Sequence, residues 1–258
     1  MKQINVNGHA FTIHGRHGDP YFDHLDIGDK TNDFLLCAAE RYVKTDDTVL
    51  DIGANIGITT CVLSLAALRG RVFSFEPDPD TFALLKHTIA VNDLANVTPH
   101  QIALGATSGS LAFLANTVSG SASHLAPAGT SLGGGNIQVE AYELDRFVER
   151  EEITRIDFMK IDVEGFELDV LKGGAASVAR FRPKVLLEFN SFTLIAYGNR
   201  NPRTFLEYLT GTFPFVYRFE GGFPVLVRDE QERLSFLHDN LVIRRCVDDL
   251  LCSFESLE

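Results

Sequence analysis

The sequence predicts an α/β fold in which a mostly parallel central sheet carries helices on both faces. Short apolar runs alternate with longer helical patterns from residue 46 onwards, and this alternation is typical of βαβ units. The composition agrees, because 45% hydrophobic and 22% charged residues are close to the average for globular domains. The 258 residues therefore predict one large domain over 46–258, preceded by a small cover over residues 1–45.

The cover begins with two short alternating runs, at residues 3–6 and 10–14, which are typical of a hairpin or of edge strands. Gly, Asp and Pro residues separate these runs. From residue 32 to 43, apolar residues recur at steps of three and four, so we expect an amphipathic helix there. The turn KTDD then leads into the main domain.

The main domain is predicted to contain strands joined by helices. Two further alternating runs, at 108–115 and 136–144, flank a stretch rich in Gly, Ser and Ala. We interpret that stretch, near 118–135, as a lid-like insertion that gates the site. The predicted strands are 48–52, 72–75, 97–104, 156–161 and 185–189, with two more near 215–219 and 224–227, and the predicted helices are 58–68, 79–91 and 166–181.

Charge and cysteine content narrow the classes of partner. The net charge of −12 opposes polyanions, so we expect a small-molecule or glycan partner and neither nucleic acid nor a membrane. The four cysteines form no CxxC pair, and the sequence shows no signal segment and no apolar run of the ~20 residues that a bilayer requires. These features predict a cytoplasmic protein with reduced thiols, and they leave its oligomeric state open.

The densest motif is VLDIGANIGITT, in which a buried strand ends at Asp51 and a glycine turn leads into a helix. Gly53 and Gly57 allow a tight turn and a close approach of a ligand to the backbone. The dinucleotide fingerprint GxGxxG needs glycines where Asn55 and Ile58 stand, which disfavours NAD. A carboxylate at the strand tip suits instead a ligand with an ammonium group and no phosphate, such as S-adenosylmethionine.

A second motif, FSFEPD, ends the next predicted strand at Glu76. Glu76 follows Gly53 by 23 residues, close to the spacing of about 20 at which an acidic residue meets ribose hydroxyls. A helix cap or a solvated loop end would explain either acidic tip alone, but two tips on adjacent strands favour a ligand. We also assign Ala103, near the end of the third predicted strand, to the cofactor site.

Two acidic motifs follow later strands. FMKIDVEGFE brings Asp162 and Glu164 to the carboxyl edge of the predicted sheet, and KVLLEFN does the same for Glu188 and Asn190. Each of these residues could instead cap a helix or lie in solvent. Asp162, Glu188 and Asn190 could also be oxygen ligands for Mg²⁺, although we assign no metal.

One histidine also belongs to the candidate site. His124 lies in the stretch SGSASHLAPAG, where it could act as a base over a bound substrate or be an ordinary surface residue. The four histidines near the start of the chain match no metal-binding spacing. We therefore assign His124, together with Asp162, Glu164 and Glu188, to catalysis.

In this order, the motifs VLDIGANIGITT, FEPD, LDRF, KIDVEGFE and LLEFN resemble the FkbM family of S-adenosylmethionine-dependent methyltransferases over roughly residues 46–190. The resemblance implies a Rossmann-like class I methyltransferase fold and O-methylation in natural-product or glycan biosynthesis. It also implies roles for single residues. Asp51, Gly53, Asn55 and Gly57 would form the loop at the methionine end of the cofactor, Glu76 would hold the ribose, and Asp162 and Glu164 would face the transfer site.

Three functions remain open from the sequence. The first is methyl transfer to a hydroxyl, an in-line displacement in which the protein aligns the acceptor and accepts its proton, with Asp162 as the leading base. The second is an NAD-dependent oxidoreductase on the same fold, and the third is a non-catalytic module that binds a nucleoside. Turnover and cofactor identity distinguish them.

Overall fold

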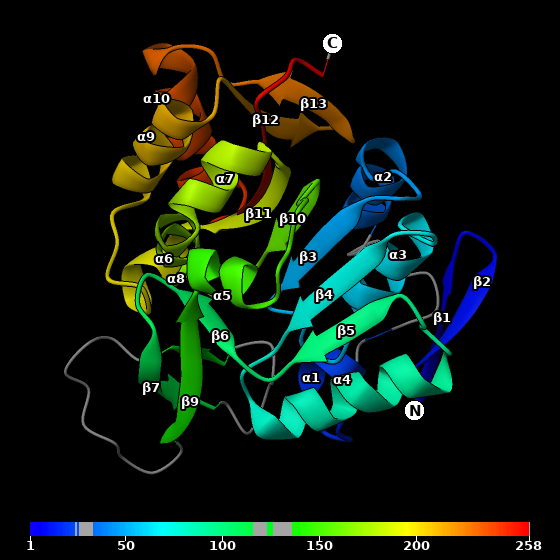
Figure 1. Ribbon diagram of the computed structural model, residues 1–258. Helices are drawn as coiled ribbons and strands as arrows, with labels where there is room; N and C mark the ends of the chain where they lie inside the picture. The colour runs from blue at the N-terminus through cyan, green and yellow to red at the C-terminus, as the bar shows by residue number, and fades with distance from the viewer. Residues whose placement is uncertain (24, 26–32, 116–122, 126–135, 258) are drawn as a thin grey trace.

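A computed structural model describes residues 1–23, 25, 33–115, 123–125 and 136–257 of the chain (Figure 1). An eight-stranded sheet forms the centre, and its five consecutive strands from β11 to β5 are parallel. Three strands at the other end, β14, β12 and β13, are antiparallel. In order across the sheet the strands are β13 (Phe223–Leu226), β12 (Phe215–Glu220), β14 (Val247–Ser253), β11 (Lys184–Asn190), β10 (Phe158–Ile161), β3 (Thr48–Ile52), β4 (Arg71–Phe75) and β5 (Val97–His100).

Helices cover both faces of this sheet, as predicted. Side chains of successive residues point to opposite faces of a strand, so both faces of a doubly covered strand must be apolar. In β3, Leu50 and Ile52 pack in the cluster that contains residues of α5, α6, α7, α9 and α10, whereas Val49 packs in the cluster of α2 and α3. The helices are α2 (Asp33–Tyr42), α3 (Ile58–Ala66), α4 (Pro79–Val91), α5 (Leu144–Arg150), α6 (Glu167–Gly173), α7 (Ala175–Phe181), α8 (Ser191–Ala196), α9 (Pro202–Thr212) and α10 (Glu230–His238), with a π-helix at Asp239–Ile243.

The predicted strand 97–104 is wrong as a single element. It divides into β5 and β6 (Ala103–Gly105), which belong to different sheets. Because β5 is the edge strand of the main sheet, the chain can leave it after His100, and β6 pairs instead with β9. The second sheet has the order β6, β9 (Asn136–Glu143), β7 (Gly109–Leu114) and β8 (His124–Leu125). Of the predicted lid near 118–135, residues 118–122 and 126–135 lie outside the described residues.

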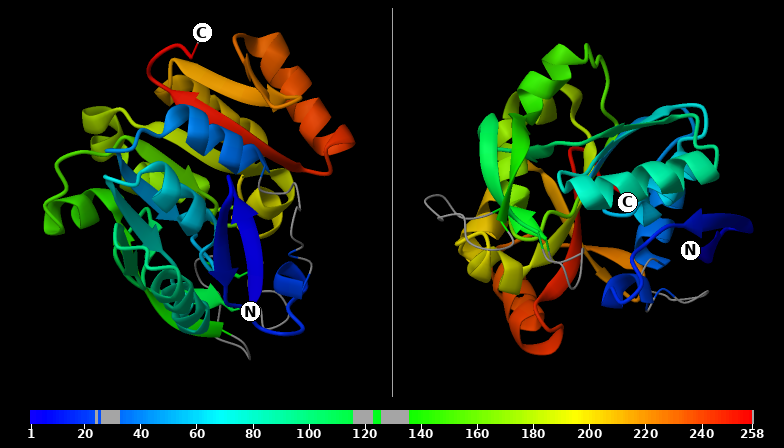
Figure 2. Two further views of the ribbon diagram at one scale, coloured as in Figure 1. Left: turned by 90° about the vertical axis from the view of Figure 1, so that its right-hand side faces the viewer. Right: turned by 90° about the horizontal axis from the view of Figure 1, so that it is seen from below.

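The N-terminal hairpin pairs β1 (Lys2–Val6) with β2 (His9–Ile13), and a short helix, α1 (Pro20–Asp23), follows it. Figure 2 shows the hairpin on the side of the main sheet that α2 covers. Phe11 and Ile13 are buried in the same cluster as Val49 of β3. The hairpin therefore shares a core with the main domain, and the division at residue 45 stays a prediction.

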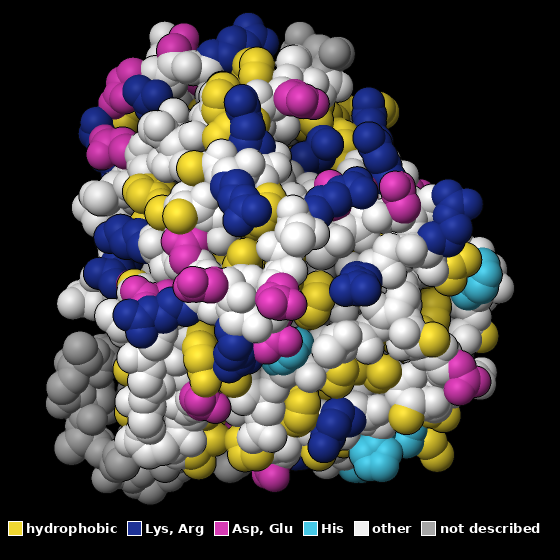
Figure 3. Space-filling model, in the orientation of Figure 1, with side chains coloured by type: hydrophobic (Ala, Val, Ile, Leu, Met, Phe, Trp, Pro, Cys, Tyr) yellow, Lys and Arg dark blue, Asp and Glu magenta, His cyan; other side chains and the backbone are white. Residues whose placement is uncertain are grey.

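The face drawn in Figure 3 carries charges of both signs, with Lys and Arg side chains spread among Asp and Glu side chains. In the described ranges, none of the helices has both the length and the apolar character that a membrane span needs.

Candidate functional site

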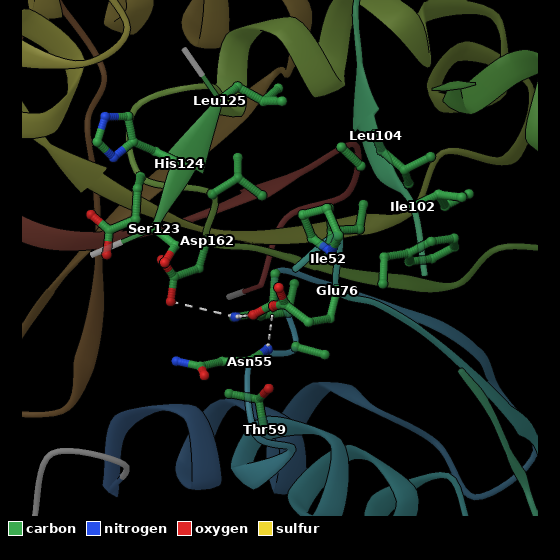
Figure 4. A pocket seen from close by; sticks show the side chains of 18 of the residues that line it. Ile52, Asn55, Thr59, Glu76, Ile102, Leu104, Ser123, His124, Leu125 and Asp162 are labelled. Carbon is green, nitrogen blue, oxygen red and sulfur yellow. Dashed lines mark hydrogen bonds and ion pairs between the residues drawn. The ribbon is translucent and has the colours of Figure 1, made fainter. Parts of the chain in front are cut away.

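A pocket lies at the carboxyl ends of β10, β3 and β4, where open α/β sheets bind ligands. The small sheet closes it on one side through Phe113 of β7 and Leu125 of β8. In Figure 4, Asp162 lies between the His124 ring and Glu76, and Ile102 and Leu104 form the opposite wall. The structure brings six of the predicted site residues to this pocket together with Glu76: Gly53, Asn55, Ala103, His124, Asp162 and Glu164.

Asp51 is fully buried and does not line the pocket, so the expected direct contact with a ligand is corrected. Its carboxylate accepts hydrogen bonds from Thr59 Oγ1 at 2.8 and 2.9 Å and from Thr60 Oγ1 at 2.6 Å. Both threonines belong to the first turn of α3. Because side chains alternate along a strand, Asp51 points toward α3, and its hydrogen bonds hold the start of this helix against β3.

The turn after β3 has a backbone that favours glycine. Gly53 has φ of +80°, and a Cβ at this position would collide with the carbonyl oxygen of Asp162. Its N–H donates to Phe75 O at 3.1 Å, which holds the turn against the end of β4. Gly57, with φ of +96°, is the N-cap residue immediately before α3 and does not line the pocket, so it shapes the turn rather than touching a ligand.

Glu76 is a buried carboxyl at the tip of β4, with 7% of its surface exposed. Its Oε2 accepts from the Asn55 N–H at 3.1 Å and its Oε1 from the Asp78 N–H at 2.9 Å. Burial raises the pKa of Glu76 to about 8, against the lowering effect of the two backbone hydrogen bonds and of Lys160. An ionised form therefore needs further donors, such as ligand hydroxyls.

Lys160 of β10 is a cation that the motif analysis missed. It is 6% exposed, and its Nζ donates to Gly53 O at 2.9 Å. The same Nζ lies 3.4 Å from Asp162 Oδ2 and 3.8 Å from Asp51 Oδ1. Burial alone would lower the pKa of Lys160, but these two carboxylates outweigh it and raise the pKa. Lys160 precedes Asp162 by two residues, so the period of a strand places both side chains on the same face, and this spacing was the available signal in the sequence.

The loop after β10 holds Glu164 in a conformation with φ of +55°, followed by Gly165 at +96°. Glu167 fixes this loop, because its Oε1 accepts from the N–H groups of Val163 and Gly165, both at 3.1 Å. Burial, with the charges of Asp162 and Glu167, raises the pKa of Glu164 to about 8. Glu164 is thus a pocket carboxyl that changes charge near neutral pH.

Asp162, Glu188 and Asp249 form an acidic row at the ends of three neighbouring strands, β10, β11 and β14. Glu188 and Asp249 are paired across the strands, and neighbouring strands lie about 4.8 Å apart. Glu188 does not line the pocket, and its Oε2 is buried with no hydrogen-bond partner among the described residues. Burial and the nearby carboxylates raise the pKa of Glu188 well above its usual value, and burial and Asp162 raise that of Asp249 to about 7.

The Mg²⁺ alternative finds no support in this arrangement. Asn190 Oδ1 accepts from the N–H groups of Phe192 and Thr193, so it caps α8. Across the ranges that the structure describes, no group of three or more His, Cys, Asp or Glu side chains could hold a metal ion.

His124 lies on the side of the pocket formed by the small sheet and is 9% exposed. Its ring stacks on Tyr197, with ring centroids 3.8 Å apart and an angle of 8° between the planes. Tyr197 follows α8 and also packs edge-to-face with Phe192, with ring centroids 5.7 Å apart. His124 therefore lines the pocket, as predicted for a site residue, and it stacks on an aromatic side chain from a segment distant in the sequence.

A family model described as the methyltransferase FkbM domain matches residues 51–210, more than half of the chain. The chain belongs to the FkbM methyltransferase family. A solved structure of an FkbM methyltransferase from Methylobacillus flagellatus KT aligns with 81% of this chain and 44% of that chain, at a TM-score of 0.51 and 16% identity. The predicted Rossmann-like methyltransferase fold is therefore confirmed for this FkbM family member.

Curated relatives of this FkbM family member are also methyltransferases. The hexuronic acid methyltransferase AglP of Haloferax volcanii is 35% identical over 130 residues, which are 50% of this chain and 50% of that protein. The 2-O-methyltransferase NoeI of Sinorhizobium fredii is 26% identical over 192 residues, covering 69% and 77% of the two chains. The chain thus spans only half the length of the first of these relatives.

Proposed function

We propose that this protein transfers a methyl group from S-adenosylmethionine to a hydroxyl of a sugar, glycan or other natural product. The observation that carries the proposal is Glu76, a buried carboxyl at the tip of β4 inside the pocket. Because burial raises the pKa of Glu76, its ionised form needs further hydrogen-bond donors, and the two ribose hydroxyls of the cofactor are such donors. Membership of the FkbM family supports the reaction class.

The order of strands suggests how the cofactor fits. Ile102 and Leu104, beyond β5, give an apolar wall for the adenine, and Glu76 on β4 faces the ribose. The remaining direction runs across β3 to β10, where Gly53 and Asp162 line the pocket. The ammonium and carboxylate of the methionine end would lie there, with Asp162 as the partner of the ammonium.

The sulfonium of the cofactor supplies an already activated methyl group, so the protein must align the acceptor oxygen and accept its proton. We assign the proton to Glu164, because a general base works best with a pKa near the operating pH. Asp162 was the leading candidate from the sequence, but its ion pair with Lys160 suits it to orienting the cofactor. Glu188, which lies outside the pocket, keeps a supporting role beside Asp162.

The acceptor would enter beyond Asp162, between the acidic row and the stacked pair of His124 and Tyr197. Aromatic faces pack well against the apolar face of a sugar ring. The AglP relative is named for a hexuronic acid. In this chain, the carboxylate of Asp162 would repel an acceptor carboxylate, so a neutral hydroxyl acceptor fits better.

The test is mass spectrometry of the purified protein incubated with S-adenosylmethionine and a panel of neutral sugars, uronates, glycans and macrocycles. We expect one added methyl group on a hydroxylated acceptor, with loss of transfer in Glu164→Gln. Quenching of NADH fluorescence on mixing would support the oxidoreductase instead, and nucleoside binding without turnover on any acceptor would support the binding module. The cytoplasmic location and the exclusion of nucleic acid stay predictions.

A further inference from the structure

Tyr21 links the N-terminal segment to the pocket. Among the described residues that line the pocket, it alone precedes residue 51, where the family match begins. The motifs discussed above lie later in the chain and gave no reason to expect it. A residue outside the matched region thus reaches the candidate cofactor site.

Contacts of the residues on either side of Tyr21 hold it in place in the short helix α1. Asp19 Oδ1 accepts from the Tyr21 N–H at 2.9 Å, and Phe22 is buried in the core that the hairpin shares with the main sheet. Lys2 Nζ, from β1, donates to Leu25 O at 3.0 Å and ties the backbone at Leu25 to the hairpin. Since Phe22 anchors the helix, the neighbouring Tyr21 is fixed against the pocket.

The surroundings of Tyr21 identify which end of the pocket it serves. The charged groups that act on its hydroxyl include Lys160 of β10, Asp162 of the loop after β10 and Asp51 of β3. Glu76 is at the tip of β4, two strands away from β10. With strands about 4.8 Å apart, that separation is about 10 Å, roughly the distance from the ribose to the amino-acid end of the cofactor.

The chemistry of the hydroxyl suits a hydrogen-bond donor. Burial raises the pKa of Tyr21 to about 12, with Lys160 opposing and Asp162 adding to the shift. The hydroxyl therefore stays protonated and neutral at neutral pH. It can donate to a ligand carboxylate without adding another charge beside Lys160 and Asp162.

From its place in the lining of the pocket, we infer that Tyr21 binds the amino-acid end of S-adenosylmethionine, donating its hydroxyl hydrogen to the carboxylate. This inference rests on the proposed function and adds a residue to its cofactor site. It also gives the N-terminal hairpin and α1 a role in the site, since they position the donor.

Calorimetry with two ligands tests the inference without relying on turnover. S-adenosylhomocysteine carries the amino-acid end, whereas 5′-methylthioadenosine has the same nucleoside thioether and lacks it. We expect Tyr21→Phe to weaken S-adenosylhomocysteine about 10- to 100-fold, the range for a lost hydrogen bond to a charged group, and to leave 5′-methylthioadenosine unchanged. Tyr42→Phe is the matched control, because its buried hydroxyl has no partner among the described residues and lies outside the pocket.

The outcomes separate this inference from the proposed function. Equal weakening of both ligands, or no weakening of either, would overturn the role of Tyr21. Failure of the wild type to bind S-adenosylhomocysteine would instead overturn the proposed function. If Tyr21→Phe lowers the unfolding midpoint, Tyr21→Gln provides a second variant with a donor, and it should bind S-adenosylhomocysteine more tightly than Tyr21→Phe.

Discussion

The raised pKa of Glu76 predicts that cofactor binding depends on pH. In the free protein the pKa of Glu76 is raised to about 8 by burial, with Asp78 adding to the shift and Lys160 opposing it. Ribose hydroxyls donate to the ionised carboxylate, so binding favours loss of the proton. At a pKa of about 8, roughly 1% of the group is ionised at pH 6 and about half at pH 8. The affinity for S-adenosylhomocysteine should therefore rise by about 50-fold between these two pH values.

The assay is calorimetry at pH 6, 7 and 8 in buffers of different ionisation enthalpy, which also counts the protons released. Glu76→Gln cannot ionise, so it should bind weakly at all three values and lose this slope. Glu188→Gln is the matched control, because it removes another carboxyl with a raised pKa that lies outside the pocket, and it should keep the slope. The variant Glu164→Gln shows how much of the change in affinity with pH comes from Glu164, the second pocket carboxyl with a pKa of about 8.

Two results would refute this reasoning. An affinity that is constant from pH 6 to 8 in the wild type would show that the ligand does not meet the ionised form of Glu76. An unchanged slope in Glu76→Gln would place the titrating group elsewhere. Because Glu76 accepts two backbone hydrogen bonds, thermal unfolding of each variant must accompany the titrations.

Three further predictions concern catalysis and stability. Glu164→Gln should lower the rate of methyl transfer by ~10²-fold or more and abolish its rise toward pH 8, and a wild-type pH profile in this variant would exclude Glu164 as the base. Gly53→Ala should lower the free energy of unfolding by at least ~2 kcal/mol, because φ is +80° and the new Cβ would collide with Asp162 O; an unchanged urea midpoint would contradict this. Glu167 is 1% exposed and has a pKa of about 7 against the usual 4.5, so the folded state binds more protons than the unfolded state between these values. The contribution of Glu167 to the free energy of unfolding, up to about 3 kcal/mol, should be lost as the pH rises through 7. Between pH 5 and 8, the free energy of unfolding in urea should therefore decline less in Glu167→Gln than in the wild type. Equal declines would count against this prediction.

Much of the central sheet could be predicted because its strands and helices have clear periods. The strand at β3, the turn at Gly53 and the following helix α3 lie where the pattern VLDIGANIGITT predicts them. The strand β14 was missed, because Asp248 and Asp249 interrupt its apolar run. It nevertheless lies between β11 and β12, and this antiparallel insertion is set by long-range pairing that no local pattern encodes.

The candidate site was predictable to the level of the strand ends and no further. Parallel strands brought the tips with Gly53, Glu76 and Asp162 to one edge, as the motif positions indicated. Asp51 differs because the period of two directs its side chain under α3, toward Thr59 and Thr60. Two residues from distant segments depend on tertiary packing and could not be found from spacing. Tyr21 of α1 lines the pocket, and Tyr197, which follows α8, stacks on the pocket residue His124.

The most direct test of the central claim is a crystal structure of the complex with S-adenosylhomocysteine. We predict the ribose hydroxyls within hydrogen-bond distance of Glu76, the adenine against Ile102 and Leu104, and the amino-acid end beside Gly53 and Asp162. A ligand bound outside this pocket, or one bound in the reverse direction with its amino-acid end at Ile102, would contradict the proposed cofactor site.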